Sequence, residues 1–341
     1  MVGEQASPVG AVPRVTSTLG WRDRLGTLLV RCGPGRMQYL VEPGLYALHN
    51  PGPDSPVLVS ANYKLSFDHL RRRLGGIDAW ILVLDTGGIN VWCAAGAGSF
   101  GSTNLVRQIQ ESEIPRLVNH RRLIVPQLAA PGVNSRLVTQ NSGFQVLFGP
   151  VEAADLPAYL AAGMEATPAM RRKNFPLSQR AVLIPVEVFQ NLKWLLPLLL
   201  SLGLLSWLGG ETWGTLASMG ALALLLAVLA GQVLTPLLLP WLPGRAFALK
   251  GMVAGLLVTL PLLASAHASP GLALPGSDFL AWPLLIGGLA SFLAMEFTGA
   301  STYTSLSGVT KEVRMAGPWQ VAAGVCGLLL LLVGRLPVWG G

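Results

Sequence analysis

A cysteine among small residues is the side chain of this sequence best suited to chemistry. Cys93 lies within Asn-Val-Trp-Cys-Ala-Ala-Gly, residues 90–96. A thiolate is a soft metal ligand and a strong nucleophile. The alternative is that Cys93 is a small buried hydrophobic residue, as most free cysteines are. The residue types alone leave both interpretations open.

The residues ahead of this stretch predict where Cys93 lies in the fold. The apolar run 80–84 indicates a buried strand that ends at Asp85 and opens into the turn Thr-Gly-Gly, 86–88. Ligand sites in open α/β sheets lie beyond the carboxyl ends of the strands. Asn90 is a favourable helix N-cap. We therefore expect Cys93 in the first turn of a short helix at that edge of a sheet.

The other two cysteines, Cys32 and Cys326, do not add a metal-binding pattern. The sequence has no CxxC or comparable ligand spacing, so we expect no iron–sulfur cluster or structural zinc held by this chain alone. Cys326 lies in an apolar run and is interpreted as a packing residue. Cys32 lies in a loop and is expected to be an unpaired thiol in a reducing compartment.

The composition changes along the chain. Residues 1–193 carry 19 of the 24 lysines and arginines and 13 of the 17 acidic residues. The remainder is rich in Leu, Ala and Gly, which is typical of bilayer-spanning segments. We expect a cytoplasmic domain over residues 1–185, including an N-terminal arm and a linker, and a transmembrane domain over residues 186–341. No basic stripe with interleaved aromatic residues is present, so nucleic acid is not an expected partner.

The first domain alternates strand-like and helix-like segments, which predicts a parallel, doubly wound, Rossmann-like α/β sheet. Residues 1–25 are expected to form a loosely ordered arm, and residues 1–5 do not resemble a signal peptide. The expected strands are residues 56–60, 81–85, 123–126 and 144–148, and the expected helices are residues 67–74, 103–112 and 155–162.

Five apolar runs follow, and each approaches the length of a membrane-spanning helix. Lysine and arginine occur between the second and third runs and between the fourth and fifth. The positive-inside rule then predicts a multi-pass protein of the inner (cytoplasmic) membrane, with a cytoplasmic N-terminal domain and an outward C-terminus. Arg335 is the one charge that opposes this orientation. The runs are residues 192–208, 216–239, 251–266, 279–295 and 319–333.

A hydroxyl-rich linker, residues 296–309, begins with Glu296 at the edge of the fourth run. It is either an ordinary polar loop or a segment that contacts the cytoplasmic domain, its cofactor or its substrate. Acids at membrane depth are candidates for function.

Residues 90–96 resemble the cap-helix motif of the HgcA family, membrane corrinoid proteins of bacterial and archaeal mercury methylation. The flanking residues 56–63 and 98–101 resemble that family too. More distantly, the first domain is similar to the corrinoid domain of the corrinoid iron–sulfur protein of the acetyl-CoA pathway. One residue departs from the pattern, because Ala97 stands where the family motif has lysine.

The resemblance implies a Rossmann-like corrinoid-binding domain with a cobalamin-type cofactor and Cys93 as the lower axial ligand to cobalt. It implies a corrinoid-dependent methyltransferase that passes a methyl group to inorganic Hg(II), giving methylmercury. A thiolate would push electron density through cobalt toward the methyl group. Histidine ligation is the alternative, but none of the four histidines (His49, His69, His120 and His267) lies in an Asp-x-His-x-x-Gly motif.

Without this lysine, the sequence lacks a positive charge beside the thiolate. A neighbouring cation lowers the pKa of a thiol, and Ala97 does not supply one. We expect cobalt binding to survive, with altered affinity or turnover.

The cofactor-binding residues are expected in the cap motif and at the strand ends. Ala94, Ala95 and Gly96 would keep the helix thin, while Trp92 would pack behind the cap, against the ring or in the core. Simple turn chemistry is the alternative for the loop residues. The expected set is Ser60, Asn62, Asp85, Gly88, Asn90, Val91, Trp92, Cys93, Ala94, Ala95, Gly96, Gly98, Phe100, Thr103, Gln127, Leu128, Gly149 and Pro150.

The resemblance also implies partners: the ferredoxin-like HgcB with two 4Fe–4S clusters, and a folate-linked methyltransferase as methyl donor. One alternative function keeps the corrinoid but uses another acceptor, such as an acetyl-CoA-type metal centre. Another alternative is a membrane sensor or transporter with a cytoplasmic ligand-binding domain.

Overall fold

The computed structural model of the chain describes residues 2–208, 210–268, 276–300 and 306–335. The chain divides into two compact units, Met1–Asn174 and Phe175–Gly341, which we call the α/β unit and the helical unit. The expected boundary after residue 185 lies within the first long helix of the helical unit.

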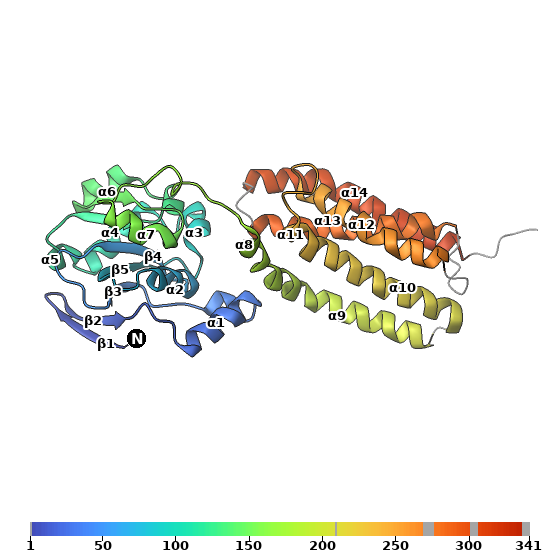
Figure 1. The fold of residues 1–341 in the computed structure, drawn as a ribbon, viewed down its shortest axis with the longest axis horizontal. Helices are drawn as coiled ribbons and strands as arrows, with labels where there is room; N and C mark the ends of the chain where they lie inside the picture. Colours follow the sequence, from blue (N-terminus) through green and yellow to red (C-terminus); the bar gives the residue numbers. More distant parts are fainter. Residues whose placement is uncertain (1, 209, 269–275, 301–305, 336–341) are drawn as a thin grey trace, which may run out of the picture. The chain divides into compact units, whose positions relative to one another are not determined.

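The α/β unit is built on a seven-stranded sheet with the order β1-β2-β3-β5-β4-β6-β7 (Figure 1). Strands β5, β4, β6 and β7 are parallel neighbours, as predicted. Strand β3 pairs antiparallel with β5, so the sheet as a whole is mixed. The strands are β1 (Gly3–Ser7), β2 (Gly10–Val15), β3 (Gly44–Leu48), β4 (Val57–Ala61), β5 (Ala79–Leu84), β6 (Arg122–Val125) and β7 (Gln145–Phe148).

Helices cover both faces of this sheet. The helices of the α/β unit are α1 (Trp21–Arg31), η1 (Arg36–Gln38), α2 (Lys64–Arg73), α3 (Val91–Ala97), α4 (Ser102–Glu111), α5 (Ile114–Leu117), η2 (Gln127–Ala129), α6 (Ser135–Ser142), η3 (Ala153–Asp155) and α7 (Leu156–Ala161).

Alternate side chains of the central strands enter two separate cores, because successive residues of a strand point to opposite faces. Val59 of β4 packs in the same core as Leu105 of α4. Leu58 packs instead with Phe67 of α2 and Tyr159 of α7. Both faces are therefore apolar, which explains why β4 and β5 are continuous hydrophobic runs. The doubly wound α/β class predicted from the sequence is confirmed.

The expectation of a loosely ordered N-terminal arm is wrong. Strands β1 and β2 form an antiparallel hairpin, and β2 continues the sheet through parallel pairing with β3. Val12 and Val15 of β2 are buried in the two cores. Strand β2 is short and contains Pro13 and Arg14, so it lacks the continuous hydrophobic run that marks β4 and β5.

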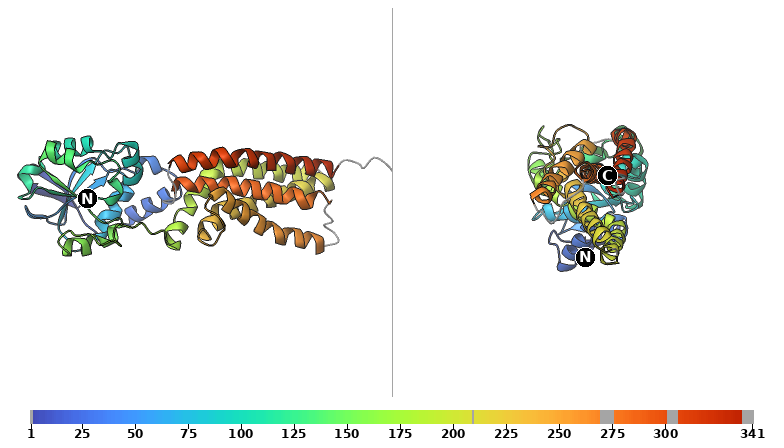
Figure 2. Two further views of the ribbon diagram at one scale, coloured as in Figure 1. Left: turned by 90° about the horizontal axis from the view of Figure 1, so that it is seen from above. Right: turned by 90° about the vertical axis from the view of Figure 1, so that its right-hand side faces the viewer.

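Among its described residues, the helical unit contains five helices long and apolar enough to cross a membrane, in agreement with the prediction. They run side by side along their lengths (Figure 2). The helical elements of this unit, some of which follow one another within a single span, are α8 (Leu177–Ala181), α9 (Ile184–Leu208), α10 (Gly210–Val228), the π-helix η4 (Leu229–Leu234), α11 (Thr235–Leu237), α12 (Phe247–Ala268), α13 (Asp278–Glu296), η6 (Phe297–Ala300) and α14 (Leu306–Val333).

Small residues bring α12 and α13 into close contact. A Cβ added at Gly255 would lie 2.8 Å from Cα of Gly287, and one added at Gly251 would lie 2.5 Å from the carbonyl oxygen of Ala290. Such close backbone approach is typical of helices that pack in a bilayer, where van der Waals contact drives association.

Several charged residues of the helical unit are paired or hydrogen-bonded. Arg335, whose charge opposed the predicted orientation, makes two contacts with the buried carboxylate of Asp278, at 2.8 and 2.9 Å. Glu296 accepts a hydrogen bond from the side chain of Asn191 at 2.5 Å. Part of the hydroxyl-rich linker, residues 301–305, lies outside the described residues, so both interpretations of this linker stay open.

Candidate functional site

The carboxyl ends of β4 and β5 are joined by a single buried side chain, that of Asn62. Its Oδ1 accepts hydrogen bonds from the backbone N–H of Thr86 at 3.1 Å, the hydroxyl of Thr86 at 2.8 Å and the N–H of Gly88 at 3.0 Å. Its Nδ2 donates to Asp85 at 3.1 Å. Asn62 therefore fixes the turn after β5 that leads into α3.

Glycines make this turn possible. Gly87 and Gly88 have φ values of 64° and 76°, the left-handed region that favours glycine. A Cβ at Gly88 would lie 2.4 Å from Cδ2 of Leu40. The segment after η1 thus packs directly over the turn, so Gly88 serves both the backbone conformation and this contact.

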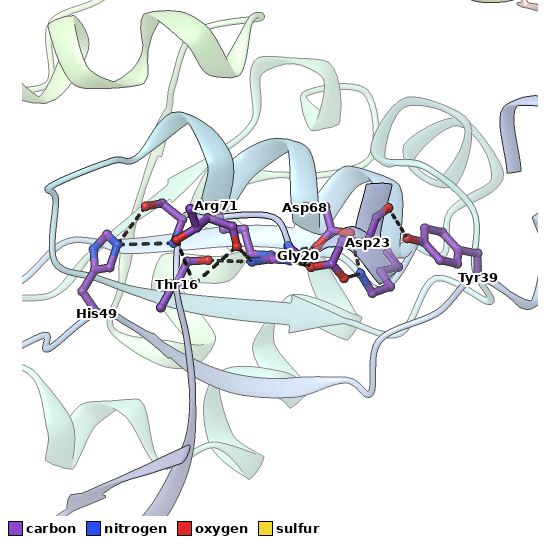
Figure 3. Close-up of polar contacts among 10 residues, drawn as sticks. Thr16, Gly20, Asp23, Tyr39, His49, Asp68 and Arg71 are labelled. Carbon is purple, nitrogen blue, oxygen red and sulfur yellow. Dashed lines mark hydrogen bonds and ion pairs between the residues drawn. The ribbon is translucent and has the colours of Figure 1, made fainter. Parts of the chain in front are cut away.

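An ionic cluster fixes α2 immediately after Asn62 (Figure 3). Asp23 of α1 contacts Lys64 at 2.6 Å and Arg71 at 2.8 Å, and Asp68 contacts the same two residues at 2.5 and 2.7 Å. Burial by itself raises the pKa of Asp23, but hydrogen bonds from Lys64 and Arg71 outweigh it and lower the pKa to about 2. The cluster attaches α1 to α2 both at Lys64 in the first turn of α2 and at Arg71 in its last turn.

Helix α3 carries Cys93 in its first turn, as predicted. The N-cap side chain of Asn90 accepts a hydrogen bond from the N–H of Cys93 at 3.0 Å, and its Nδ2 donates to Sγ of Cys93 at 3.4 Å. The helix ends at Gly98, whose φ of 86° is left-handed. One asparagine therefore starts the helix and contacts the thiol.

The inner face of α3 is closely packed. Ala94 and Ala95 are buried in the core. A Cβ at Gly132 would lie 2.9 Å from the carbonyl oxygen of Ala95 and 2.4 Å from that of Phe100. Small residues on both sides of this contact let the loop after η2 support α3 from behind.

The outer face of α3 is open. Cys93 is exposed, as are Gly96 and Ala97 one turn further along. A Cβ at Gly96 would meet no atom within 4 Å. The interpretation of Cys93 as a buried hydrophobic residue is therefore wrong. The thiol is exposed, and the exposed residues beside it, Gly96 and Ala97, carry little or no side chain.

The ends of β6 and β7 contribute to the same edge of the sheet, because these strands run parallel to β4. Gln127 of η2 accepts a hydrogen bond from Arg171 at 2.6 Å. Gly149 and Pro150, after β7, are buried. These strand ends are compact and offer less free surface than α3.

The predicted site residues differ in accessibility. Those exposed are Asp85, Cys93, Gly96, Gly98 and Thr103, and those half-buried are Asn90, Val91, Trp92, Gln127 and Leu128. Those buried are Ser60, Asn62, Gly88, Ala94, Ala95, Phe100, Gly149 and Pro150. The buried residues pack or hydrogen-bond within the protein, so the structure gives them a supporting role. Contact with a cofactor stays a prediction for the whole set.

Two supporting residues were missed by the sequence analysis. Gly132 lies behind α3, and Leu40 lies over Gly88. The Pro-Gly pair at 131–132 signals a turn, but nothing in the sequence indicates that this turn meets α3. Leu40 carries no local signal at all.

Two of the histidines are distant from Cys93 along the strands. His49 contacts the carbonyl oxygen of Ile77, just ahead of β5, at 3.0 Å, and His120 contacts that of Ser55, ahead of β4, at 2.9 Å. Both lie toward the amino ends of the parallel strands, whereas Cys93 follows the carboxyl end of β5. Neither is placed to replace Cys93 as a ligand.

Among the residues that the structure describes, no group of three or more His, Cys, Asp or Glu side chains could hold a metal ion. A metal bound at Cys93 would therefore need most of its ligands from elsewhere. A planar cofactor that supplies its own equatorial ligands fits the exposed thiol and the open face of α3. The residues present are compatible with a corrinoid.

Comparison with known proteins places the similarity in the α/β unit. Residues 33–160 match the family model CdhD, the CO dehydrogenase/acetyl-CoA synthase delta subunit. The gamma subunit of the acetyl-CoA decarbonylase/synthase complex of Archaeoglobus fulgidus is 37% identical over 122 residues, which is 35% of this chain and 26% of that protein. The corresponding subunit of Methanopyrus kandleri is 36% identical over 122 residues, again 35% and 26%.

The subunit of Methanocaldococcus jannaschii is 37% identical over 97 residues, 28% of this chain and 20% of that protein. The chain thus spans about a quarter of the length of the curated relatives that it matches first. The family match contains β4, β5, α3 and Cys93. These findings support the resemblance of the α/β unit to the corrinoid proteins of the acetyl-CoA pathway.

Proposed function

We propose that the chain is a membrane-anchored, corrinoid-dependent methyltransferase in which Cys93 is the lower axial ligand to cobalt. The observation that carries this proposal is the exposed thiol on the open face of α3, held in place by Asn90. The similarity of residues 33–160 to subunits named for acetyl-CoA synthesis supports a cofactor of this class.

The residues around Cys93 suit a thiolate ligand. Its Sγ lies in the first turn of a helix, where backbone N–H groups favour negative charge. Asn90 adds a donor at 3.4 Å. A corrinoid, when bound, supplies a cobalt centre that carries a methyl group. Cys93 would donate electron density to the metal, Asn90 would orient the thiolate, and the packed inner face of α3 would hold both in position.

We further propose inorganic Hg(II) as the methyl acceptor and methylmercury as the product. The support is the resemblance of residues 90–96 to the HgcA family, together with the five helices of membrane-spanning length. In this proposal HgcB, with two 4Fe–4S clusters, returns electrons to the site. A folate-linked methyltransferase supplies the methyl group. The positive-inside pattern favours the inner membrane with a cytoplasmic α/β unit.

A second candidate acceptor is an acetyl-CoA-type metal centre. It is favoured by the relatives, which are named as subunits of an acetyl-CoA decarbonylase/synthase complex. The five candidate membrane spans favour the first candidate, since the corrinoid protein of the acetyl-CoA pathway is expected to be soluble.

A labelled-methyl assay separates these candidates. The full chain in detergent is loaded with methylcobalamin carrying an isotopic label, and Hg(II) or a purified acetyl-CoA synthase metal centre is then added. We expect labelled methylmercury from the native chain and none from Cys93→Ala. Transfer only to the acetyl-CoA synthase centre would establish the second candidate. A protein that retains no corrinoid would support the sensor or transporter alternative.

A further inference from the structure

Helix α1 exposes a continuous apolar stripe on the α/β unit. Trp21, Leu25, Leu28 and Leu29 are 69, 46, 59 and 48% exposed. Residues of a helix follow one another at about 100°, so these four fall within one stripe roughly 80–100° wide. Large apolar side chains gathered on one helical face usually mark an interaction surface.

The opposite face of α1 is attached to the α/β unit. Val30 is buried, and a Cβ at Gly26 would lie 2.6 Å from the hydroxyl oxygen of Tyr39. Asp23 is held by Lys64 and Arg71 (Figure 3). These contacts fix the orientation of α1 on the α/β unit. The apolar stripe is therefore exposed although the helix is firmly attached.

Arginines flank this stripe on both sides. At about 100° per residue, Arg22 falls on one side of it, while Arg24 and Arg31 fall on the other. Asp23 is the one acid of the α1 sequence, and its charge is directed to Lys64 and Arg71. The exposed charged residues of α1 are Arg22 and Arg24, and both are positive.

We propose that α1 is an interfacial helix that inserts its apolar stripe into the surface of an anionic bilayer. An apolar face bordered by arginine, with tryptophan in the stripe, is the pattern of helices that lie in the headgroup region. Anionic headgroups complement the flanking arginines. Among the described residues, the same chain carries five helices of membrane-spanning length, which is consistent with a membrane protein.

A second copy of the chain fits this face less well. A symmetric dimer through α1 would bring the arginines of both copies to one interface, and like charges would repel. A lipid surface meets the same stripe with charges of the opposite sign. The proposal does not depend on the corrinoid or on the methyl acceptor.

The test uses the full chain in lipid nanodiscs, with cysteines 32, 93 and 326 replaced by serine. A bimane label is attached at Leu28→Cys in the stripe or at Leu137→Cys on α6. Leu137 is a matched control because it is also an exposed leucine of a helix in the α/β unit, at 39%. Quenching by doxyl-labelled lipid reports contact with the acyl region.

We expect quenching at position 28 to exceed that at position 137 by at least about twofold in nanodiscs with roughly one third phosphatidylglycerol. Quenching at position 28 should decrease in nanodiscs of pure phosphatidylcholine, and also in the double variant Arg22→Gln/Arg24→Gln. Equal quenching at both positions, or none at position 28, would overturn the proposal. Absence of quenching together with cross-linking between copies at position 28 would assign the face to a dimer instead.

Discussion

Replacement of Asn62 by alanine tests whether one buried side chain positions the Cys93 helix. Its carboxamide takes part in four hydrogen bonds to the turn after β5. At a net contribution of about 1 kcal/mol each, with some donors re-satisfied by water, we expect a loss of about 3 kcal/mol. For a unit of this size, that corresponds to roughly 6–12 °C in the melting temperature.

The assay combines thermal unfolding with hydrogen exchange. In Asn62→Ala the N–H groups of Thr86 and Gly88 lose their acceptor, so exchange of a peptide covering residues 84–92 should accelerate. Asn141→Ala is the matched control, because Asn141 is exposed and donates one hydrogen bond to its own helix, at 2.7 Å. A loss below about 1 kcal/mol, with exchange of this peptide unchanged, would refute the reasoning.

Three further predictions concern α1, the back of α3 and the departure from the family motif. Because the pKa of Asp23 is lowered from 3.8 to about 2, its ion pairs contribute about 2 kcal/mol above pH 4, lost as the pH falls toward 2. Asp23→Asn should remove that acid dependence in hydrogen exchange of residues 21–31. Gly132→Ala should cost about 1–3 kcal/mol in thermal unfolding, because its Cβ would overlap the backbone at Ala95. Ala97→Lys should raise the alkylation rate of Cys93 at neutral pH, an effect that weakens in high salt, and an unchanged rate would remove the concern about the missing lysine.

The central strands and the Cys93 helix could be predicted because their signals are local. A buried run followed by Thr-Gly-Gly and Asn90 specifies strand, turn and helix start within a dozen residues, and the structure agrees. The signals for the five long helices are equally local, because the length of each apolar run by itself indicates a membrane-spanning helix. Strands β1 and β2 were missed because they are short strands that bury few residues.

The supporting contacts of the site could not be read from the sequence, because they join distant segments. Asn62 and Gly88 are far apart in the chain, and only the parallel pairing of β4 with β5 brings them together. Gly132 behind α3 depends on the same tertiary packing. The orientation of α1 likewise depends on Asp23 reaching α2, which no local pattern encodes.

The most direct test of the proposed ligation is the visible absorption spectrum of the full chain reconstituted with methylcobalamin. Cys93→Ala removes the thiol, and Cys32→Ala is the matched control within the same unit. We expect a thiolate-type shift in the native chain and in Cys32→Ala, lost in Cys93→Ala. A bound corrinoid whose spectrum is the same in all three proteins would contradict ligation by Cys93.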